Sequence, residues 1–262
     1  MSKIFEALEQ AQRDKSDLSL QMLSTVQEAT EHEEKPAEKK KHVAMQQCVS
    51  HAAVDLESEM LCLYQNIDCL LPDTPDKSIL FVGPQGGEGV STIVREFARM
   101  AVTRLDKRVL IMDTAHHNPT QHLYFKINSS YGWKDVMGNG ESAEKACHVA
   151  GNANLFLSPT SLQPVLPPQL HNQSATTDFL GEVKDKFNLL LVDASPVAVS
   201  PDSIIMSRHT DGVVIVIEAE RTRWQVVESL RNKIVRNGGN VLGVVLNRRK
   251  YHIPHAIYRL LG

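Results

Sequence analysis

The sequence contains no hydrophobic run that approaches the ~18–20 residues needed to cross a membrane. It has only four cysteines and no Cys-x-x-Cys pair, which predicts free thiols in a reducing compartment. The net charge of −3 gives no electrostatic reason to expect a nucleic-acid partner. The N-terminus lacks the apolar core of a signal peptide. We therefore expect a cytoplasmic protein that reaches the inner face of a membrane only through a partner.

Composition divides the 262 residues into three segments. Residues 1–27 include a short amphipathic helix pattern with Ser2 as its N-cap, which fits either packing on the main domain or docking to another protein. Residues 28–51 are dominated by charged and small side chains and are expected to form a flexible linker. Residues 52–262 carry the patterns of a folded domain, beginning with a predicted helix at 52–71 that has no lysine or arginine.

From residue 77 onward, apolar runs typical of buried strands alternate with amphipathic helix patterns. Strands are expected at 79–82, 109–112, 154–157, 189–192, 213–217 and 241–246. Helices are expected at about 92–104, 174–186, 201–209 and 222–235. This order predicts an α/β domain of three layers, with a mostly parallel central sheet and helices on both faces. Ligands of such sheets bind at the carboxyl ends of the strands.

A glycine-rich loop follows the first of these strands and precedes the first helix. It reads Gly86-Gly87-Glu88-Gly89-Val90-Ser91-Thr92. The glycines allow consecutive N–H groups to face an anion, and the positive end of the following helix points at the same place. The loop is therefore a candidate phosphate-binding P-loop, in which Ser91 stands where a hydroxyl binds magnesium. The position that usually holds a lysine is occupied by Val90.

Two further strands end in a carboxylate, at Asp113 and at Asp193. Each aspartate taken alone could simply cap a turn. Because parallel strands deliver both to the sheet edge that carries the loop, the three elements together favour a magnesium–nucleotide site. Ser91, Asp113 and Asp193 are the candidate magnesium ligands. The neighbouring histidines, 116, 117 and 122, lack a ligand pattern and are expected to be exposed. Both tryptophans are expected to be packing anchors.

On these blocks the chain resembles the cytoplasmic P-loop tyrosine kinases of bacteria, which regulate capsule and exopolysaccharide synthesis. That family belongs to a wider deviant-Walker group with septum-site and plasmid-partition ATPases. The resemblance runs from about residue 55 to the C-terminus and includes the opening residues 2–8. It implies ATP or ADP with magnesium as cofactor, catalytic roles for Asp113 and Asp193, and an Asn247 beside the adenine. It also implies self-association and a membrane chain-length or export protein as partner.

The sequence departs from that family at several functional positions. Val90 replaces the loop lysine, and Ala115 replaces the second carboxylate of an Asp-x-Asp motif. The helix at 52–71 lacks the arginines used for ring-like association, and the tail offers only Tyr251 and Tyr258 as acceptors. These losses favour a degenerate, pseudokinase-like regulator with weak or absent nucleotide binding. The alternatives are an active tyrosine autokinase and a partition-type ATPase switch.

Overall fold

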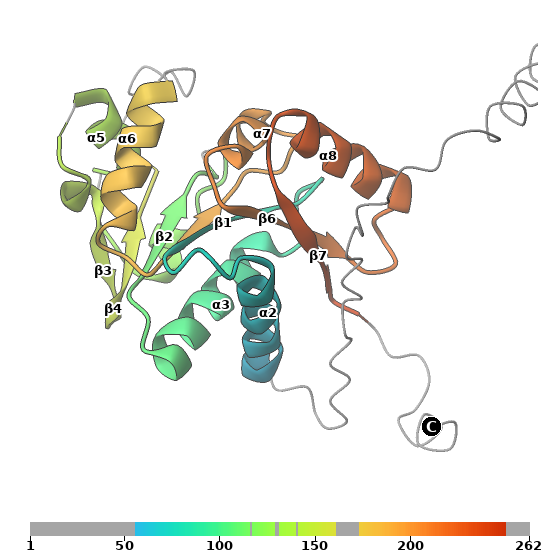
Figure 1. Cartoon of the computed structure of the whole chain (residues 1–262), viewed down its shortest axis with the longest axis horizontal. Coiled ribbons are helices and arrows are strands. Elements are labelled where there is room, and N and C mark those ends of the chain that lie inside the picture. Colours follow the sequence, from blue (N-terminus) through green and yellow to red (C-terminus); the bar gives the residue numbers. More distant parts are fainter. Residues whose placement is uncertain (1–55, 116, 129–130, 140, 161–172, 250–262) are drawn as a thin grey trace, which may run out of the picture. The chain divides into compact units, whose positions relative to one another are not determined.

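In the computed structural model of the chain, the described residues are 56–115, 117–128, 131–139, 141–160 and 173–249. They form a seven-stranded sheet with helices on both faces (Figure 1). The expected segments at 1–27 and 28–51, together with Tyr251 and Tyr258, lie outside the described residues. Within the described ranges, no helix combines the length and the apolar character needed to span a bilayer.

The strands follow the order β3-β4-β2-β5-β1-β6-β7 across the sheet. All neighbours are parallel except β3 and β4, which pair antiparallel at one edge. The strands are β1 (Lys77–Val82), β2 (Val109–Asp113), β3 (His148–Ala150), β4 (Asn152–Ser158), β5 (Leu189–Asp193), β6 (Gly212–Glu218) and β7 (Val241–Asn247). The mostly parallel α/β sheet that the sequence predicts is confirmed.

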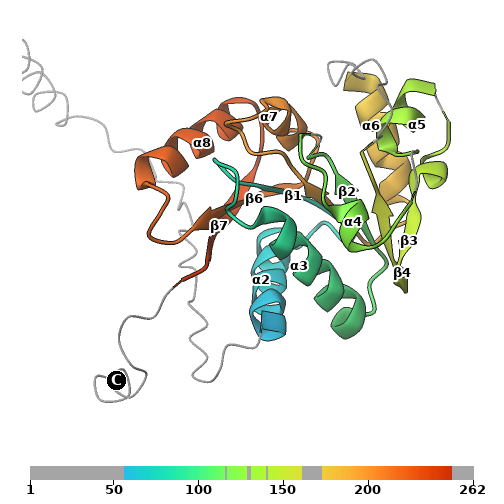
Figure 2. The same cartoon turned by 180° about the vertical axis from the view of Figure 1, so that it is seen from behind.

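Two groups of helices cover the sheet, as the opposite views show (Figures 1 and 2). One face carries α2 (Leu56–Leu70) and α3 (Val90–Leu105). The other face carries α5 (Trp133–Asn139), α6 (Gln173–Lys184), α7 (Asp202–Ser207) and α8 (Trp224–Arg236). The short α4 (Gln121–Tyr124) and the 3-10 turn η1 (Ala143–Ala146) lie in the connections.

Alternate residues of the central strands point into two separate hydrophobic clusters. In β1, Ile79 and Phe81 pack toward α2 and α3, whereas Leu80 and Val82 pack toward the opposite helices. The central strands β1, β2 and β5 are buried along their whole length. Burial on both faces is the reason that these strands read as continuous apolar runs rather than as alternating patterns.

The prediction that both tryptophans are packing anchors is wrong for Trp224. Trp133 is 1% exposed, but Trp224 is 66% exposed at the first position of α8. In the sequence, Trp224 precedes Val227 by about one helical turn, so the helical period assigns Trp224 to the same buried stripe of α8. The stripe that packs on the sheet begins only at Val227 and continues through Leu230 and Ile234.

Candidate functional site

The glycine-rich loop connects β1 directly to the N-terminus of α3. Gly87 and Gly89 both have φ of 88°, a backbone conformation that glycine adopts without the steric cost of a Cβ. The helix begins at Val90, two residues earlier than predicted. The Val90 side chain is 8% exposed and belongs to the hydrophobic cluster between α3 and the sheet. The first residue of α3 therefore packs its apolar side chain in the hydrophobic core.

Glu88 turns its side chain inward and ties the loop to the connection between β6 and α8. It is 2% exposed, and its carboxylate accepts hydrogen bonds from the Glu218 N–H and from Thr222 Oγ1, the latter at 2.8 Å. The Asn247 amide donates to the Glu88 carbonyl at 2.9 Å. Asn247 also lies over Gly89, where an added Cβ would come within 2.1 Å of its Nδ2. The structure therefore places Asn247 against the loop backbone.

Asp113 and Asp193 end β2 and β5 at the same edge of the sheet as the loop. The two residues are register partners of the parallel pair, and both are at most 1% exposed. Asp113 accepts hydrogen bonds from the Ala115 N–H at 3.0 Å and from the Gln121 N–H at 3.3 Å. The indole of Trp133 donates to the Asp113 carbonyl at 2.8 Å, which fixes the start of α5 above the strand.

Gln121 is a site residue that the sequence did not reveal. Its side chain is fully buried, and its Nε2 lies 2.6 Å from Asp193 Oδ2 and 3.2 Å from the carbonyl oxygen of Ser91. The amide therefore bridges the loop helix and the carboxylates. A single glutamine in a polar connection carries no pattern that distinguishes it from a solvent-exposed residue, so only the fold identifies its role.

Burial raises the pKa of both aspartates above the ordinary range. For Asp113, hydrogen bonds from the backbone of Ala115 and Gln121 oppose the effect of burial. For Asp193, the charge of Asp113 raises the pKa further, while hydrogen bonds from Gln121 and Ser91 oppose the rise. Two adjacent carboxylates without a cation favour holding a proton, since like charges in a poorly solvated place repel.

The oxygen atoms of this pair and their neighbours are of the kind that a magnesium ion takes. Asp193 Oδ1 and Gln121 Oε1 are buried and have no hydrogen-bond partner among the described residues. Ser91 reaches Asp193 with its side chain, so all three predicted magnesium ligands lie together. Unpaired buried oxygens are costly unless a cation or a donor satisfies them. The residues present therefore fit a hard divalent cation.

Histidines play no part in this arrangement as far as the structure describes it. The described residues contain no group of three or more His, Cys, Asp or Glu side chains that could hold a metal ion. His116 lies outside the described residues, and His117 and His122 do not join such a group.

Arg95, Lys134 and Arg221 are described cations near the site, and none of them belongs to the loop. Arg95 donates to Thr92 Oγ1 at 3.1 Å and covers the Tyr124 ring at 4.5 Å. Burial lowers the pKa of Lys134 on α5, and the charges of Asp202 and Asp113 oppose this. Arg221 extends from the β6–α8 connection, and its Nη1 would lie 3.5 Å from a Cβ added to Gly87.

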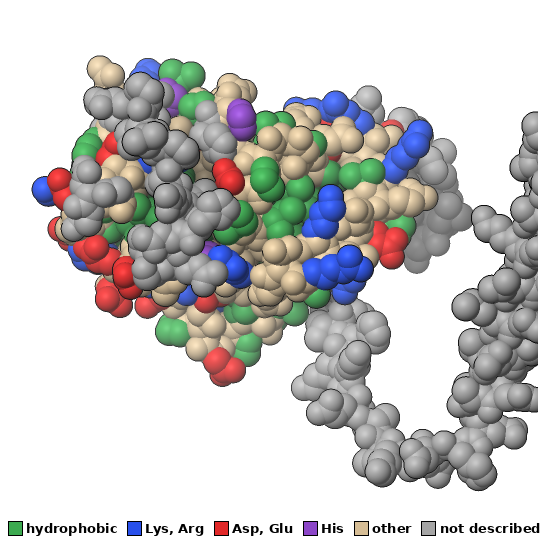
Figure 3. Space-filling model, turned by 90° about the horizontal axis from the view of Figure 1, so that it is seen from above, with side chains coloured by type: hydrophobic (Ala, Val, Ile, Leu, Met, Phe, Trp, Pro, Cys, Tyr) green, Lys and Arg blue, Asp and Glu red, His purple; other side chains and the backbone are tan. Residues whose placement is uncertain are grey.

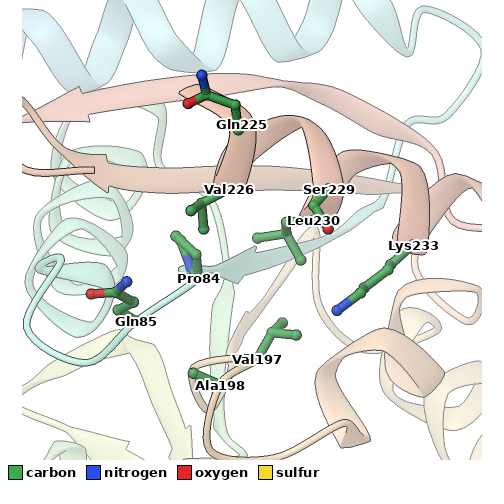
Figure 4. A pocket seen from close by; sticks show the side chains of 9 residues that line it. All are labelled: Pro84, Gln85, Val197, Ala198, Gln225, Val226, Ser229, Leu230 and Lys233. Atoms are coloured by element: carbon green, nitrogen blue, oxygen red, sulfur yellow. The ribbon is translucent and has the colours of Figure 1, made fainter. Parts of the chain in front are cut away.

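A pocket of about 350 Å³ opens beside the loop, on its α8 side. Its lining comes from the start of the loop, the connection after β5 and α8: Pro84, Gln85, Val197, Ala198, Gln225, Val226, Ser229, Leu230 and Lys233 (Figure 4). Seen from the side of α5–α8, hydrophobic side chains gather in the middle of the face, with lysine and arginine side chains beside them (Figure 3). The pocket includes neither aspartate, so it is a recess next to the glycine-rich loop and separate from the carboxylate pair.

Comparisons with known proteins agree with this fold. No family model matches the chain. The tyrosine-protein kinase YwqD of Bacillus subtilis (strain 168) is 23% identical over 197 residues, which cover 75% of this chain and 82% of the relative. The crystal structure of the chimerical protein CapA2B2 matches with a TM-score of 0.66 and 25% identity over 74% of this chain and 85% of that one.

A more distant structure has the same fold. The septum-site-determining protein MinD from Pyrococcus horikoshii OT3, complexed with Mg-ADP, matches with a TM-score of 0.54 and 17% identity. The match covers 71% of this chain and 77% of that one. The chain thus shares the α/β fold of MinD. In sequence, it is a homologue of the bacterial P-loop tyrosine kinases.

Proposed function

We propose that this protein is a degenerate relative of the bacterial tyrosine kinases that binds ATP or ADP with magnesium weakly and transfers phosphate poorly or not at all. The observation that carries the proposal is Val90. It heads α3 with an apolar side chain packed in the core, at the position where the resemblance places a lysine. A lysine there would neutralise charge on the β and γ phosphates as the phosphoryl group leaves.

The rate of any phosphoryl transfer depends on how much transition-state stabilisation is missing without the lysine. Removing one charge aimed at a transition state costs ~3–4 kcal/mol, or about 10²–10³ in rate. Ala115 supports the same conclusion. It stands where the resemblance has a second carboxylate, and it offers Asp113 only a backbone N–H. Arg95 is engaged with Thr92 and Tyr124, so it is a poor replacement for the missing cation.

The remaining residues support nucleotide binding. The loop would present backbone N–H groups to phosphates, and Asn247 steadies the loop from the side. Ser91, Asp113, Asp193 and Gln121 would hold magnesium through their oxygen atoms. When bound, magnesium neutralises phosphate charge and orients the terminal phosphate. Asp193 would accept the proton of an attacking hydroxyl in any residual transfer.

In the cell, we propose that the protein acts in the cytoplasm at the inner face of the membrane. It would regulate exopolysaccharide or capsule synthesis through a membrane chain-length or export protein, and it would be able to self-associate. The similarity to tyrosine-protein kinases such as YwqD and to CapA2B2 supports this role. The α8 side of the loop, with its pocket and adjacent basic side chains, offers a surface for such a partner.

The deciding experiment incubates the pure full-length chain with ATP and magnesium and blots for phosphotyrosine. We expect a signal at or near that of the Asp193→Asn variant. The Val90→Lys variant tests the cause, because restoring the cation should raise ATP affinity about tenfold by calorimetry. A strong wild-type signal that disappears in Asp193→Asn would overturn the proposal in favour of an active autokinase. ATP-dependent dimerisation in sedimentation, without phosphotyrosine, would instead identify a partition-type switch.

A further inference from the structure

Arg221 lies against the tip of the phosphate-binding loop. A Cβ built on Gly87 would be 3.5 Å from Arg221 Nη1, and Gly87 has the positive φ that shapes the loop for an anion. Arg221 belongs to the connection between β6 and α8, far from the loop in sequence. The fold therefore brings a guanidinium to a loop whose own sequence supplies no cation.

The backbone beneath Arg221 is fastened to the loop on both sides. Glu88 accepts hydrogen bonds from the Glu218 N–H and from Thr222 Oγ1, which flank Arg221 in the chain. The Glu88 carboxylate is buried, so this attachment excludes water and is expected to be rigid. Arg221 is thus anchored at its base, while its guanidinium is about half exposed above the loop.

In the structure, the Arg221 guanidinium forms an ion pair with the carboxylate of Glu218. Arg221 Nη1 lies 2.8 Å from Glu218 Oε2, and Arg248 Nη1 shares the same oxygen at 3.3 Å. Exposed ion pairs of this kind contribute little to stability, because solvent screens them and two side chains lose freedom. A phosphate group, with more charge and a geometry that matches the guanidinium fork, competes well for the same donor.

We propose that Arg221 supplies, from outside the loop, the cation that Val90 does not, and that it binds the terminal phosphate of a nucleoside di- or triphosphate. Glu218 holds Arg221 in place until the phosphate replaces it. This inference rests on the proposed nucleotide-binding function. It differs from that function in naming the residue that makes binding possible without a loop lysine.

The other cations near the site are placed for a different task. Arg95 stacks on Tyr124, and Lys134 acts on Asp202 and Asp113, so both face the carboxylate side. The guanidinium of Arg221, in contrast, lies at the loop tip, with its Nη1 3.5 Å from a Cβ built on Gly87. Lys134→Ala is therefore a useful comparison variant, because it removes a nearby charge without touching the loop.

The test is calorimetric titration of the full-length chain with ADP and ATP in the presence of magnesium. We expect Arg221→Ala to weaken ADP binding at least tenfold and Glu218→Gln to strengthen it severalfold. The matched control is Arg223→Ala, an exposed arginine two residues further along, which should change the affinity less than twofold. Adding Val90→Lys to Arg221→Ala should restore most of the lost affinity.

The outcomes separate this inference from the proposed function. If the wild type binds ADP and Arg221→Ala binds it equally well, the inference is wrong and the proposed function stands. A loss in Lys134→Ala rather than in Arg221→Ala also overturns it. If the wild type transfers phosphate strongly and Arg221→Ala does not, the degenerate-kinase proposal fails while Arg221 keeps its role. If the wild type binds no nucleotide, both are wrong.

Discussion

The two halves of the site differ in what holds their residues in place. The carboxylate half is built on the ends of two buried central strands, which bring Asp113 and Asp193 together next to Ser91 of α3. The phosphate half is a loop, and it carries Val90 where the resemblance has a lysine. A residue at the end of a fully buried strand is constrained by packing on both faces, whereas a loop tolerates substitution as long as its backbone path survives. An apolar side chain at position 90 is therefore compatible with the fold.

If the loop half is held by its backbone path rather than by side-chain chemistry, Gly89→Ala should have the largest effect. An added Cβ would approach Asn247 Nδ2 to 2.1 Å at a φ of 88°. We expect loss of detectable ADP binding by calorimetry and a decrease of about 3 kcal/mol in the free energy of unfolding. Gly86→Ala is the matched control, since nothing lies within 4 Å of its Cβ. Equal effects of the two changes would contradict this view of the loop.

In the carboxylate half, Gln121→Leu should have the next largest effect. The change removes the amide that donates to Asp193 at 2.6 Å and leaves Ser91 as the remaining side-chain donor to that buried carboxylate. We expect a loss of about 2 kcal/mol in the free energy of unfolding, measured by urea denaturation without divalent cations. Magnesium should recover part of the loss by satisfying the freed oxygens. Gln225→Leu, on the surface of α8, serves as control. If Gln121→Leu leaves the free energy of unfolding unchanged, the Gln121 amide does not stabilise the carboxylate half.

The smallest expected effect is a pH dependence of the carboxylate half. The raised pKa of Asp193 means that the folded state binds more protons than the unfolded state, so stability falls as pH rises from about 4 to about 7. Asp193→Asn removes the part of this effect that Asp193 contributes. Measured without magnesium, its stability relative to the wild type should improve by on the order of 1–2 kcal/mol across that range.

Asp211 provides a control of opposite sign. Burial would raise its pKa, but hydrogen bonds from Lys184 and Ser78 lower it below the ordinary range. The stability that this carboxylate contributes is present above its usual pKa and is lost only as pH falls. Asp211→Asn should therefore cost the same at pH 6 and at pH 8. A parallel pH trend for the two variants would show that the carboxylate pair is not the source of the effect.

Long buried elements were predictable from sequence, and single polar residues were not. All six expected strands occur, because continuous apolar runs between helix patterns have few other interpretations. The strand β3 was missed because three residues, His148–Ala150, are too few to show a period. The prediction of Asp113 and Asp193 as neighbours is confirmed by their register. Gln121 and Arg221 escaped prediction because their roles depend on which segments the fold brings together.

Glu88 has a consequence for communication within the molecule. Its side chain joins the loop to Thr222, two residues before α8 begins, so any displacement of the loop pulls on the start of that helix. The exposed Trp224 and the pocket beside Leu230 lie on the same helix. If the proposed nucleotide binding moves the loop, a protein bound to α8 would respond to that movement. Such coupling would depend only on whether a nucleotide is bound and would not require its hydrolysis.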